Sequence, residues 1–269
     1  MDLGLDGRRA LVTGGSRGIG LAIGRALARE GAHVALLARD GEAVRAAATA
    51  LTGELGADAP TIIGVSADTG DEGAVARAVA EVTDALGGID IAVNAAARPA
   101  SSGPPASALG TTDDAVRAEV EVKVLGYLRV ARAVAPQMVE RGWGRIVNVS
   151  GLNARRTGSV AGSVRNVAVS ALTKNLADEL GPHGVNVTVV HPGLTRTERT
   201  PGMIAARAEQ DGTDDATAEA SLAADVSIGR LVDAAEVADV VAFLASPRSV
   251  AINGDAVAAG GGQTGPIFY

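Results

Sequence analysis

The stretch from Thr13 to Gly20, which reads Thr-Gly-Gly-Ser-Arg-Gly-Ile-Gly, decides the fold of this chain. It follows a short apolar run and opens an Ala-rich segment of helical period. Glycines at 14, 18 and 20 allow a tight turn and let another molecule approach the backbone closely. A helix that begins here points its free N–H groups and the positive end of its dipole at the turn. The stretch therefore predicts a pyrophosphate-binding loop between a strand and a helix.

Short apolar runs alternate with longer helical segments along the whole chain. Each run is apolar almost throughout, which is typical of parallel strands that are covered on both faces. Repeated strand–helix–strand units need right-handed crossovers and produce a doubly wound sheet. We expect strands at Arg8–Thr13, His33–Ala38, Thr61–Val65, Ile89–Asn94, Arg145–Ser150, Val185–Val190 and, weakly, Asp255–Ala258. We expect helices at Gly18–Glu30, Gly41–Leu55, Asp71–Leu86 and Val120–Arg141.

These elements predict a Rossmann-like α/β fold with about seven parallel strands in a three-layer αβα arrangement. The 269 residues, 47% of them hydrophobic, form one domain (1–269) that can bury a sizeable core. Two stretches interrupt the pattern. Ala95–Gly110 is a loop rich in Pro, Ser and Gly. Thr200–Val226, within 196–228, is either a solvated pair of surface helices or, as we favour, a substrate lid.

Composition excludes several classes of protein. The net charge of −7 argues against binding to the nucleic-acid backbone. The absence of cysteine excludes disulfides, thiolate metal sites and a Cys nucleophile, and the three histidines have no spacing suited to a metal site. No stretch has the apolar length of a signal peptide core or a membrane span. We expect a cytoplasmic protein that uses neither metal nor membrane.

Three motifs together resemble the short-chain dehydrogenase/reductase family: TGGSRGIG, Asn94-Ala-Ala-Ala and His191-Pro-Gly-Leu-Thr-Arg-Thr197. The resemblance covers nearly the whole chain and implies a nicotinamide dinucleotide cofactor. Asp68 matches the family's adenine-binding acid, although it could instead cap the helix that begins near Asp71. The cofactor-binding residues implied by the resemblance are Gly14, Ser16, Arg17, Gly18, Ile19, Gly20, Arg39, Ala67, Asp68, Asn94, Ala95, Pro192, Gly193, Thr195 and Thr197.

The end of the second strand indicates which cofactor is preferred. A carboxylate there would bond a free ribose 2′-hydroxyl and repel a 2′-phosphate. This chain has Ala38 at that position, followed by Arg39, while Arg17 and Ser16 lie in the glycine loop. Two guanidinium groups suit a dianionic phosphate, so we expect NADP(H) to be preferred over NAD(H). The alternative is that Arg39 and Asp40 form an ordinary solvated pair.

The family's usual catalytic residues are missing. Its Tyr-x-x-x-Lys motif donates or accepts the substrate's proton, a Ser orients the carbonyl group, and an Asn lies on an earlier helix. The chain has only two tyrosines, and neither is followed by a lysine four residues later. Alignment through Leu172–Leu180 puts Gly162 and Asn166 at the Tyr and Lys positions. Lys123 replaces the Asn, and Gly151 stands at the Ser position, next to Ser150.

We expect Lys123, Ser150 and Asn166 to be the catalytic candidates. A buried Lys123 could replace the cation lost at position 166, binding ribose or donating a proton, or it could simply extend to solvent. The expected function is an NADP(H)-dependent oxidoreductase that acts on a small carbonyl, imine or enone. The alternatives are a lyase or isomerase on the same scaffold and a non-catalytic NADP(H)-binding protein. The resemblance further implies a homo-oligomer, tetramer or dimer, in which Tyr269 packs at an interface or reaches a partner's cleft.

Overall fold

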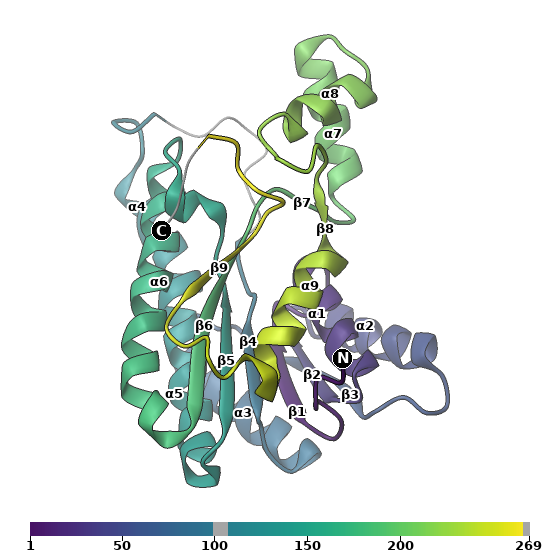
Figure 1. The fold of residues 1–269 in the computed structure, drawn as a ribbon, viewed down its shortest axis with the longest axis vertical. Helices are drawn as coiled ribbons and strands as arrows, with labels where there is room; N and C mark the ends of the chain where they lie inside the picture. The colour runs from purple at the N-terminus through teal and green to yellow at the C-terminus, as the bar shows by residue number, and fades with distance from the viewer. Residues whose placement is uncertain (99–106, 266–269) are drawn as a thin grey trace.

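The computed structural model describes residues 1–98 and 107–265, and it contains a seven-stranded parallel sheet with helices on both faces (Figure 1). The strand order is β3-β2-β1-β4-β5-β6-β9. This order confirms the expected doubly wound α/β fold. The strands are β1 (Arg9–Thr13), β2 (His33–Ala38), β3 (Ile62–Ser66), β4 (Ile91–Asn94), β5 (Gly144–Val149), β6 (Val185–Pro192) and β9 (Ala256–Ala259).

The central strands are buried along their whole length, as their apolar sequences require. Every residue of β4, β5 and β6 is buried, because helices cover both faces of the sheet. Strand β3 begins one residue later than expected, at Ile62, which pairs with Val34 of β2. Strand β6 continues through His191 and Pro192, where it pairs with the edge strand β9. Because this pairing is with a distant strand, the apolar pattern predicted an end of β6 at Val190, two residues too early.

Two groups of helices form the outer layers. Helices α1 (Gly18–Arg29), α2 (Gly41–Leu55) and α9 (Ala234–Ala245) pack on one face, where Ile23, Leu27 and Val241 join the core. Helices α3 (Glu72–Leu86), α5 (Gly126–Arg141) and α6 (Val160–Leu180) cover the other face. Figure 1 shows these groups on opposite sides of the strands. No helix in the described part of the chain is both long and apolar enough to cross a membrane.

The helix expected at Val120–Arg141 begins earlier and changes its winding. Thr112 caps α4 (Asp113–Val120), a π-helical turn follows at Glu121–Leu125, and α5 continues from there. The early start was missed because α4 has no buried residue and hence no apolar periodicity. The π turn widens the helix locally, and such turns are frequent at functional sites. Its central residue is Lys123.

The segment after β6 forms a small projecting subdomain. Helices α7 (Thr200–Asp211) and α8 (Asp215–Ala223) extend away from the sheet at the top of Figure 1. Their own apolar cluster consists of Ile204, Ala208 and Ala218, with Leu222 against it. The short strands β7 (Thr195–Arg196) and β8 (Val232–Asp233) pair at its base. A helix pair therefore occupies the segment that we expect to be a lid.

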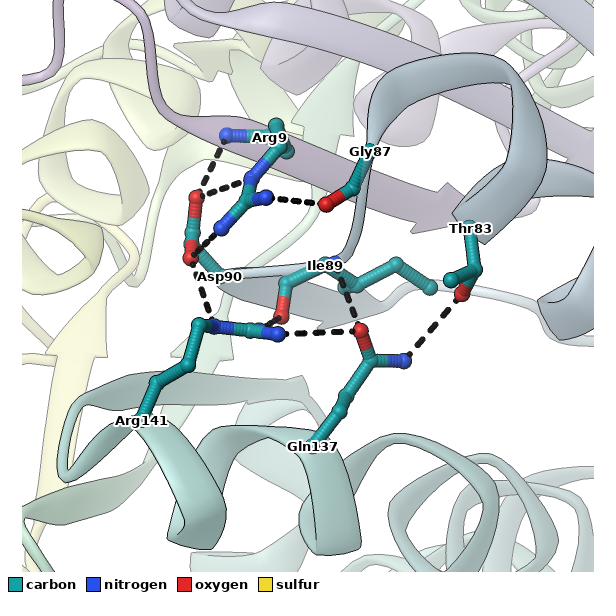
Figure 2. Close-up of polar contacts among 7 residues, drawn as sticks. All are labelled: Arg9, Thr83, Gly87, Ile89, Asp90, Gln137 and Arg141. Carbon is teal, nitrogen blue, oxygen red and sulfur yellow. Dashed lines mark hydrogen bonds and ion pairs between the residues drawn. The ribbon is translucent and has the colours of Figure 1, made fainter.

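An ion-pair network joins the amino ends of β1 and β4 to α5 (Figure 2). The Arg9 guanidinium donates to both carboxylate oxygens of Asp90, at 2.7 and 2.6 Å. Arg141 from α5 approaches the same carboxylate at 3.5 Å and bonds the Ile89 carbonyl oxygen. Gln137 accepts from the Ile89 amide at 2.9 Å. The network lies at the opposite ends of these strands from the expected cofactor loop, so it contributes to stability.

The rest of the expected loop Ala95–Gly110 has no helix or strand at 95–98 and 107–110. Positions 99–106 lie outside the described residues, and so does Tyr269, for which we expect an interface role.

Candidate active site

A cavity of about 710 Å³ opens at the carboxyl ends of β1, β2 and β4. From β1 the sheet extends to β2 and β3 on one side and to β4, β5 and β6 on the other, so the strand order switches direction between β1 and β4. Ligands of doubly wound sheets bind at such a switch point. The cavity wall includes all six residues expected in the glycine loop and also Arg39, Asp68, Ala95 and Thr197. The wall residues are Gly14, Ser16, Arg17, Gly18, Ile19, Gly20, Leu37, Ala38, Arg39, Asp40, Ala43, Ala67, Asp68, Thr69, Ala95, Ala96, Ala97, Arg98, Val122, Thr197, Glu198 and Arg199.

The glycines of the loop are required by close backbone approaches. A Cβ atom at Gly20 would lie 2.2 Å from the Gly14 carbonyl oxygen, and one at Gly14 would lie 2.8 Å from that of Ala95. Gly18 has φ +59°, a left-handed conformation that favours glycine. Helix α1 then begins with no side-chain cap from Arg17. Its amino end is therefore a site for a negatively charged group.

The side chains at the end of β2 are positively charged overall. Arg39 and Arg17 both line the cavity, and Ala38 contributes only a methyl group. The Asp40 carboxylate is held as the amino-terminal cap of α2, where it accepts from the Ala43 amide at 3.0 Å. The carboxylate is thus engaged by its own helix. Two guanidinium groups remain to face a ligand at this end of the cavity.

The acidic residue expected to bind adenine lies in the cavity wall. Asp68 accepts from the Gly70 amide at 2.9 Å. Asp71, rather than Asp68, caps α3 by accepting from the Ala74 amide at 2.9 Å. The alternative that Asp68 caps this helix is therefore wrong.

Other expected cofactor residues lie behind the cavity wall. Asn94 is fully buried and donates to the Asn148 side chain at 2.9 Å, so it joins β4 to β5. Pro192 ends β6, and Thr195 donates to the Gly193 carbonyl oxygen at 3.0 Å. None of these four is part of the wall as the structure describes it. They support the residues that are, such as Thr197.

Lys123 is buried beside the carboxyl end of β5. Its side chain extends from the π turn, and its Nζ atom donates to the Ser150 carbonyl oxygen at 2.7 Å. Only 5% of the residue is exposed. Burial, together with the positive charge of Arg165, lowers the pKa of Lys123 to about 7, although Glu119 opposes the shift. The expectation of a buried cation at this position is met, and Lys123 does not extend to solvent.

A network of buried polar groups connects the catalytic candidates. The Ser150 hydroxyl donates to the Asn166 carbonyl oxygen at 3.2 Å, and Ser170 donates to the same oxygen at 3.3 Å. The Asn166 side chain is 2% exposed, and its Oδ1 atom has no hydrogen-bond partner among the described residues. Lys123, Ser150 and Asn166 are thus brought together, and none of the three is among the residues of the cavity wall.

His191 completes this network from β6. Its Nδ1 atom accepts from the Gly151 amide at 3.3 Å, which leaves the proton of the neutral ring on Nε2, 3.4 Å from the Ser170 hydroxyl. Burial lowers the pKa of His191 to about 4, with the charge of Arg155 a further cause. The ring is therefore neutral at physiological pH and holds the backbone after β5 in place.

The comparisons with known proteins agree with this geometry. The family model described as Enoyl-(Acyl carrier protein) reductase matches residues 14–264. Oxidoreductase UcpA of Salmonella typhimurium is 34% identical and aligns over 97% of this chain and 96% of its own. Sorbitol dehydrogenase of Cereibacter sphaeroides is 33% identical, over 91% of this chain and 93% of its own. The chain belongs to the short-chain dehydrogenase/reductase family.

Solved structures of the family support the same assignment. L-sorbose reductase from Gluconobacter frateurii, complexed with NADPH and L-sorbose, superposes with a TM-score of 0.89 at 29% identity. The match covers 99% of this chain and 100% of that one. With these relatives, the chain is an oxidoreductase whose fold binds a nicotinamide cofactor.

Gly162 and Gly151 are the residues that the sequence alignment places at the family's usual Tyr and Ser positions. A Cβ atom at Gly162 would lie 3.0 Å from Ser159 Oγ and 3.1 Å from Asn153 Nδ2. One at Gly151 would lie 3.0 Å from Asn166 Nδ2. Polar side chains therefore fill the space that larger residues would need.

Tyr127 does not replace the missing phenol. Its hydroxyl has one proton to donate, and the carbonyl oxygens of Val149 at 2.9 Å and Ala96 at 3.1 Å are its two acceptors; the residue is 1% exposed. Burial raises the pKa of this phenol above its ordinary value, so it does not ionise at physiological pH.

The sequence did not point to Glu198, Arg199 or Arg98, which also line the cavity. The last of the three family motifs ends at Thr197, and no periodicity distinguishes the charged residues after it. A carboxylate five residues after the Pro192-Gly193 turn was the available signal, because that turn meets the cofactor in the family. Glu198 accepts from the Gly18 amide at 3.1 Å, a contact across 180 positions of the chain.

Proposed function

We propose that this protein is an NADP(H)-dependent oxidoreductase in which Lys123 performs the proton transfer that the family assigns to tyrosine. The observation that carries the proposal is the buried ammonium group at the Ser150 carbonyl oxygen, in contact with the network that holds Asn166. Charged lysines are rarely buried without a paired carboxylate unless they serve a function. No carboxylate forms an ion pair with Lys123 in the described part of the chain.

The residues present fit a dinucleotide phosphate. The residue before α1, Arg17, provides no side-chain cap to the helix, and Arg17 and Arg39 line the cavity where a 2′-phosphate would need cations. Ala38 removes the carboxylate that would select a free 2′-hydroxyl. The unpaired Oδ1 atom of buried Asn166 is an acceptor suited to a hydroxyl group of ribose or substrate. When bound, NADPH supplies a hydride to the substrate.

Lys123 is suited to hold and release a proton near neutral pH. Efficient general acids have a pKa close to the working pH, and burial brings that of Lys123 to about 7. The Lys123 ammonium group has three protons to donate, and one of them goes to the Ser150 carbonyl oxygen. This hydrogen bond fixes the direction of the lysine side chain. We propose that the two remaining donors serve the oxygen or nitrogen atom of a reducible group.

The substrate is proposed to be a small carbonyl, imine or enone compound. Among the relatives, a sorbitol dehydrogenase and an L-sorbose reductase are named for polyols and a ketose, which makes polyhydroxy ketones the first compounds to test. The helix pair α7–α8, within 196–228, is proposed as a lid over the substrate. Arg156, after β5, lies 3.7 Å from Asp225 at its base, so the segment is tied to the active-site loop.

We also propose that the protein acts as a homo-oligomer, a dimer or tetramer. Val164 and Val167 on the outer face of α6 are 45% and 51% exposed, and Val160 lies one turn before them. Contiguous exposed valines favour contact with another chain. Sedimentation of the wild type and of Val164→Glu/Val167→Glu tests this directly, with dissociation expected for the double variant.

The decisive experiment follows the absorbance of reduced cofactor with a panel of ketoses, ketones, imines and enones. NADPH oxidation that depends on substrate, and is faster than NADH oxidation, supports the proposal. Substrate conversion without cofactor oxidation would replace it with a lyase or isomerase. Tight NADPH binding without turnover of any compound would replace it with a non-catalytic binding protein.

A further inference from the structure

The carboxylate of Glu198 binds the amino end of helix α1 inside the cofactor cavity. Its Oε2 atom accepts from the Gly18 amide at 3.1 Å, and both residues are part of the wall of the 710 Å³ cavity. A Cβ atom built on Gly18 would have Glu198 Oε1 at 3.9 Å, with Thr197 Cγ2 next to it. The loop after β6 thus places a negative charge at the first residue of α1.

Nothing else in the described residues holds this carboxylate. Glu198 forms no ion pair within 1–98 and 107–265, and its side chain is exposed. Its backbone, by contrast, is anchored on both sides, because the Thr197 amide donates to Thr200 Oγ1 at 2.8 Å and Thr200 is buried. The side chain can therefore turn away from Gly18 without any rearrangement of the loop.

The same amide is needed by a dinucleotide. The amino end of α1 is the place where the pyrophosphate of such a cofactor is expected to bind. A backbone N–H group has one proton to donate, and two anions at one helix terminus repel each other. The carboxylate and a phosphate cannot both have this amide as their partner.

We propose that Glu198 competes with the cofactor pyrophosphate for the amino end of α1 and thereby weakens cofactor binding and speeds its release. This inference rests on the proposed function, since it requires that the chain binds NADP(H). Cofactor release limits turnover in many enzymes. A carboxylate that takes over the amide as the phosphate leaves stabilises the released state, so it accelerates that step.

The test compares the wild type with Glu198→Gln and Glu198→Ala by titration and stopped-flow fluorescence of NADPH. Hydrogen bonds to charged groups contribute enough that removing the competitor is expected to lower the NADPH Kd about tenfold, mainly through a slower koff. Glu209→Gln is the matched control, because it removes one exposed carboxylate from α7 and makes no contact with the glycine loop. Its Kd should equal that of the wild type.

Ligand fragments locate the effect. Both Glu198 variants should bind 2′,5′-ADP more tightly than the wild type, since this fragment contains the phosphate that faces α1. They should bind 2′-AMP, which lacks that phosphate, with unchanged affinity. Equal tightening of both fragments would overturn the proposal, because a general charge effect would then explain it.

The outcomes separate this inference from the proposed function. If the wild type binds NADPH and the Glu198 variants have the same Kd or a higher one, only the competition by Glu198 is wrong. If the wild type does not bind NADPH at millimolar concentration, both the proposed function and the competition are wrong. Circular dichroism of each variant confirms that it is folded, as the exposed position of Glu198 leads us to expect.

Discussion

The ammonium group of Lys123, on the π turn before α5, reaches the carbonyl oxygen of Ser150 at the end of β5, 2.7 Å away. Ser150 in turn donates to the backbone of Asn166, the residue that the sequence alignment places at the family's Lys position. Lys123 therefore contacts the same buried network as the residue at position 166.

Replacing Lys123 with Met is expected to lower kcat/KM for carbonyl reduction by about 100-fold or more, because the proton donor is removed. In the wild type the rate should be highest below pH 7 and should fall as the pH rises through about 7, where the ammonium group loses its proton. Arg165 and Glu119 flank this group, and His191 is already neutral there. Steady-state kinetics from pH 5.5 to 9 check this. Unchanged activity in Lys123→Met would exclude a catalytic role for the residue.

The same variant is expected to be more stable than the wild type, by on the order of 1–3 kcal/mol at pH 7, since a buried cation is replaced by an apolar side chain. Burial places the pKa of Lys123 below that of an unfolded lysine, so the unfolded state binds more protons between about pH 7 and 10. Wild-type stability should therefore rise across this range relative to Lys123→Met. Urea denaturation of both proteins measures the difference, with Lys174→Met, at an exposed lysine of α6, as the control.

Placing a lysine at position 166 of α6 and removing the lysine at position 123 tests whether the two positions can hold the same cation. Asn166→Lys alone should be destabilised, because it puts a second ammonium group next to that of Lys123 in a buried site. Adding Lys123→Asn should restore stability, with a coupling energy on the order of 1–3 kcal/mol. A complete double-mutant cycle by urea denaturation gives this value. Additive effects would mean that the two positions do not share one site.

Arg39→Ala is expected to raise the NADPH Kd about 10- to 100-fold and to leave the NADH Kd within about twofold, because a charge-assisted bond to the 2′-phosphate is lost. Isothermal titration with both cofactors measures the two affinities. Arg45→Ala removes a neighbouring exposed arginine of α2 that is not part of the cavity wall, and it should bind both cofactors normally. Equal weakening of NADH and NADPH in Arg39→Ala would argue against a 2′-phosphate site.

Asp90→Asn is expected to lower the free energy of unfolding by about 2–3 kcal/mol, since Arg9 and Arg141 lose a shared carboxylate (Figure 2). Burial raises the pKa of Asp90, but the Arg9 bonds and charge outweigh it and hold the pKa below its usual value. The stabilisation is therefore complete above the unfolded pKa near 4 and is lost as the pH falls through the lower folded one. Denaturation between pH 2 and 6 should show a smaller acid-dependent loss in Asp90→Asn, while Asp58→Asn, at an exposed position, should match the wild type.

Local sequence was sufficient for the sheet and the cofactor loop. The central strands β4, β5 and β6 are buried on both faces, so each appears as an apolar run, and the seven expected runs all form strands of one sheet. Gly14 and Gly18 have left-handed φ angles, and Gly20 lies against the Gly14 carbonyl group, so local backbone geometry favours glycine at all three positions. Helix α4 was not predicted because none of its residues is buried, so its sequence has no apolar pattern.

The residues around Lys123 could be assembled only by the packing of distant elements. The sequence shows that position 123 is a lysine. Its burial depends on the π turn and on contact with Ser150, 27 residues away, after β5. The approach of Glu198 to Gly18 spans 180 residues and depends on how the loop after β6 crosses the top of β1. Short-range patterns report hydrophobic periodicity and turn geometry, whereas charge environment and competition for a single amide arise from three-dimensional proximity.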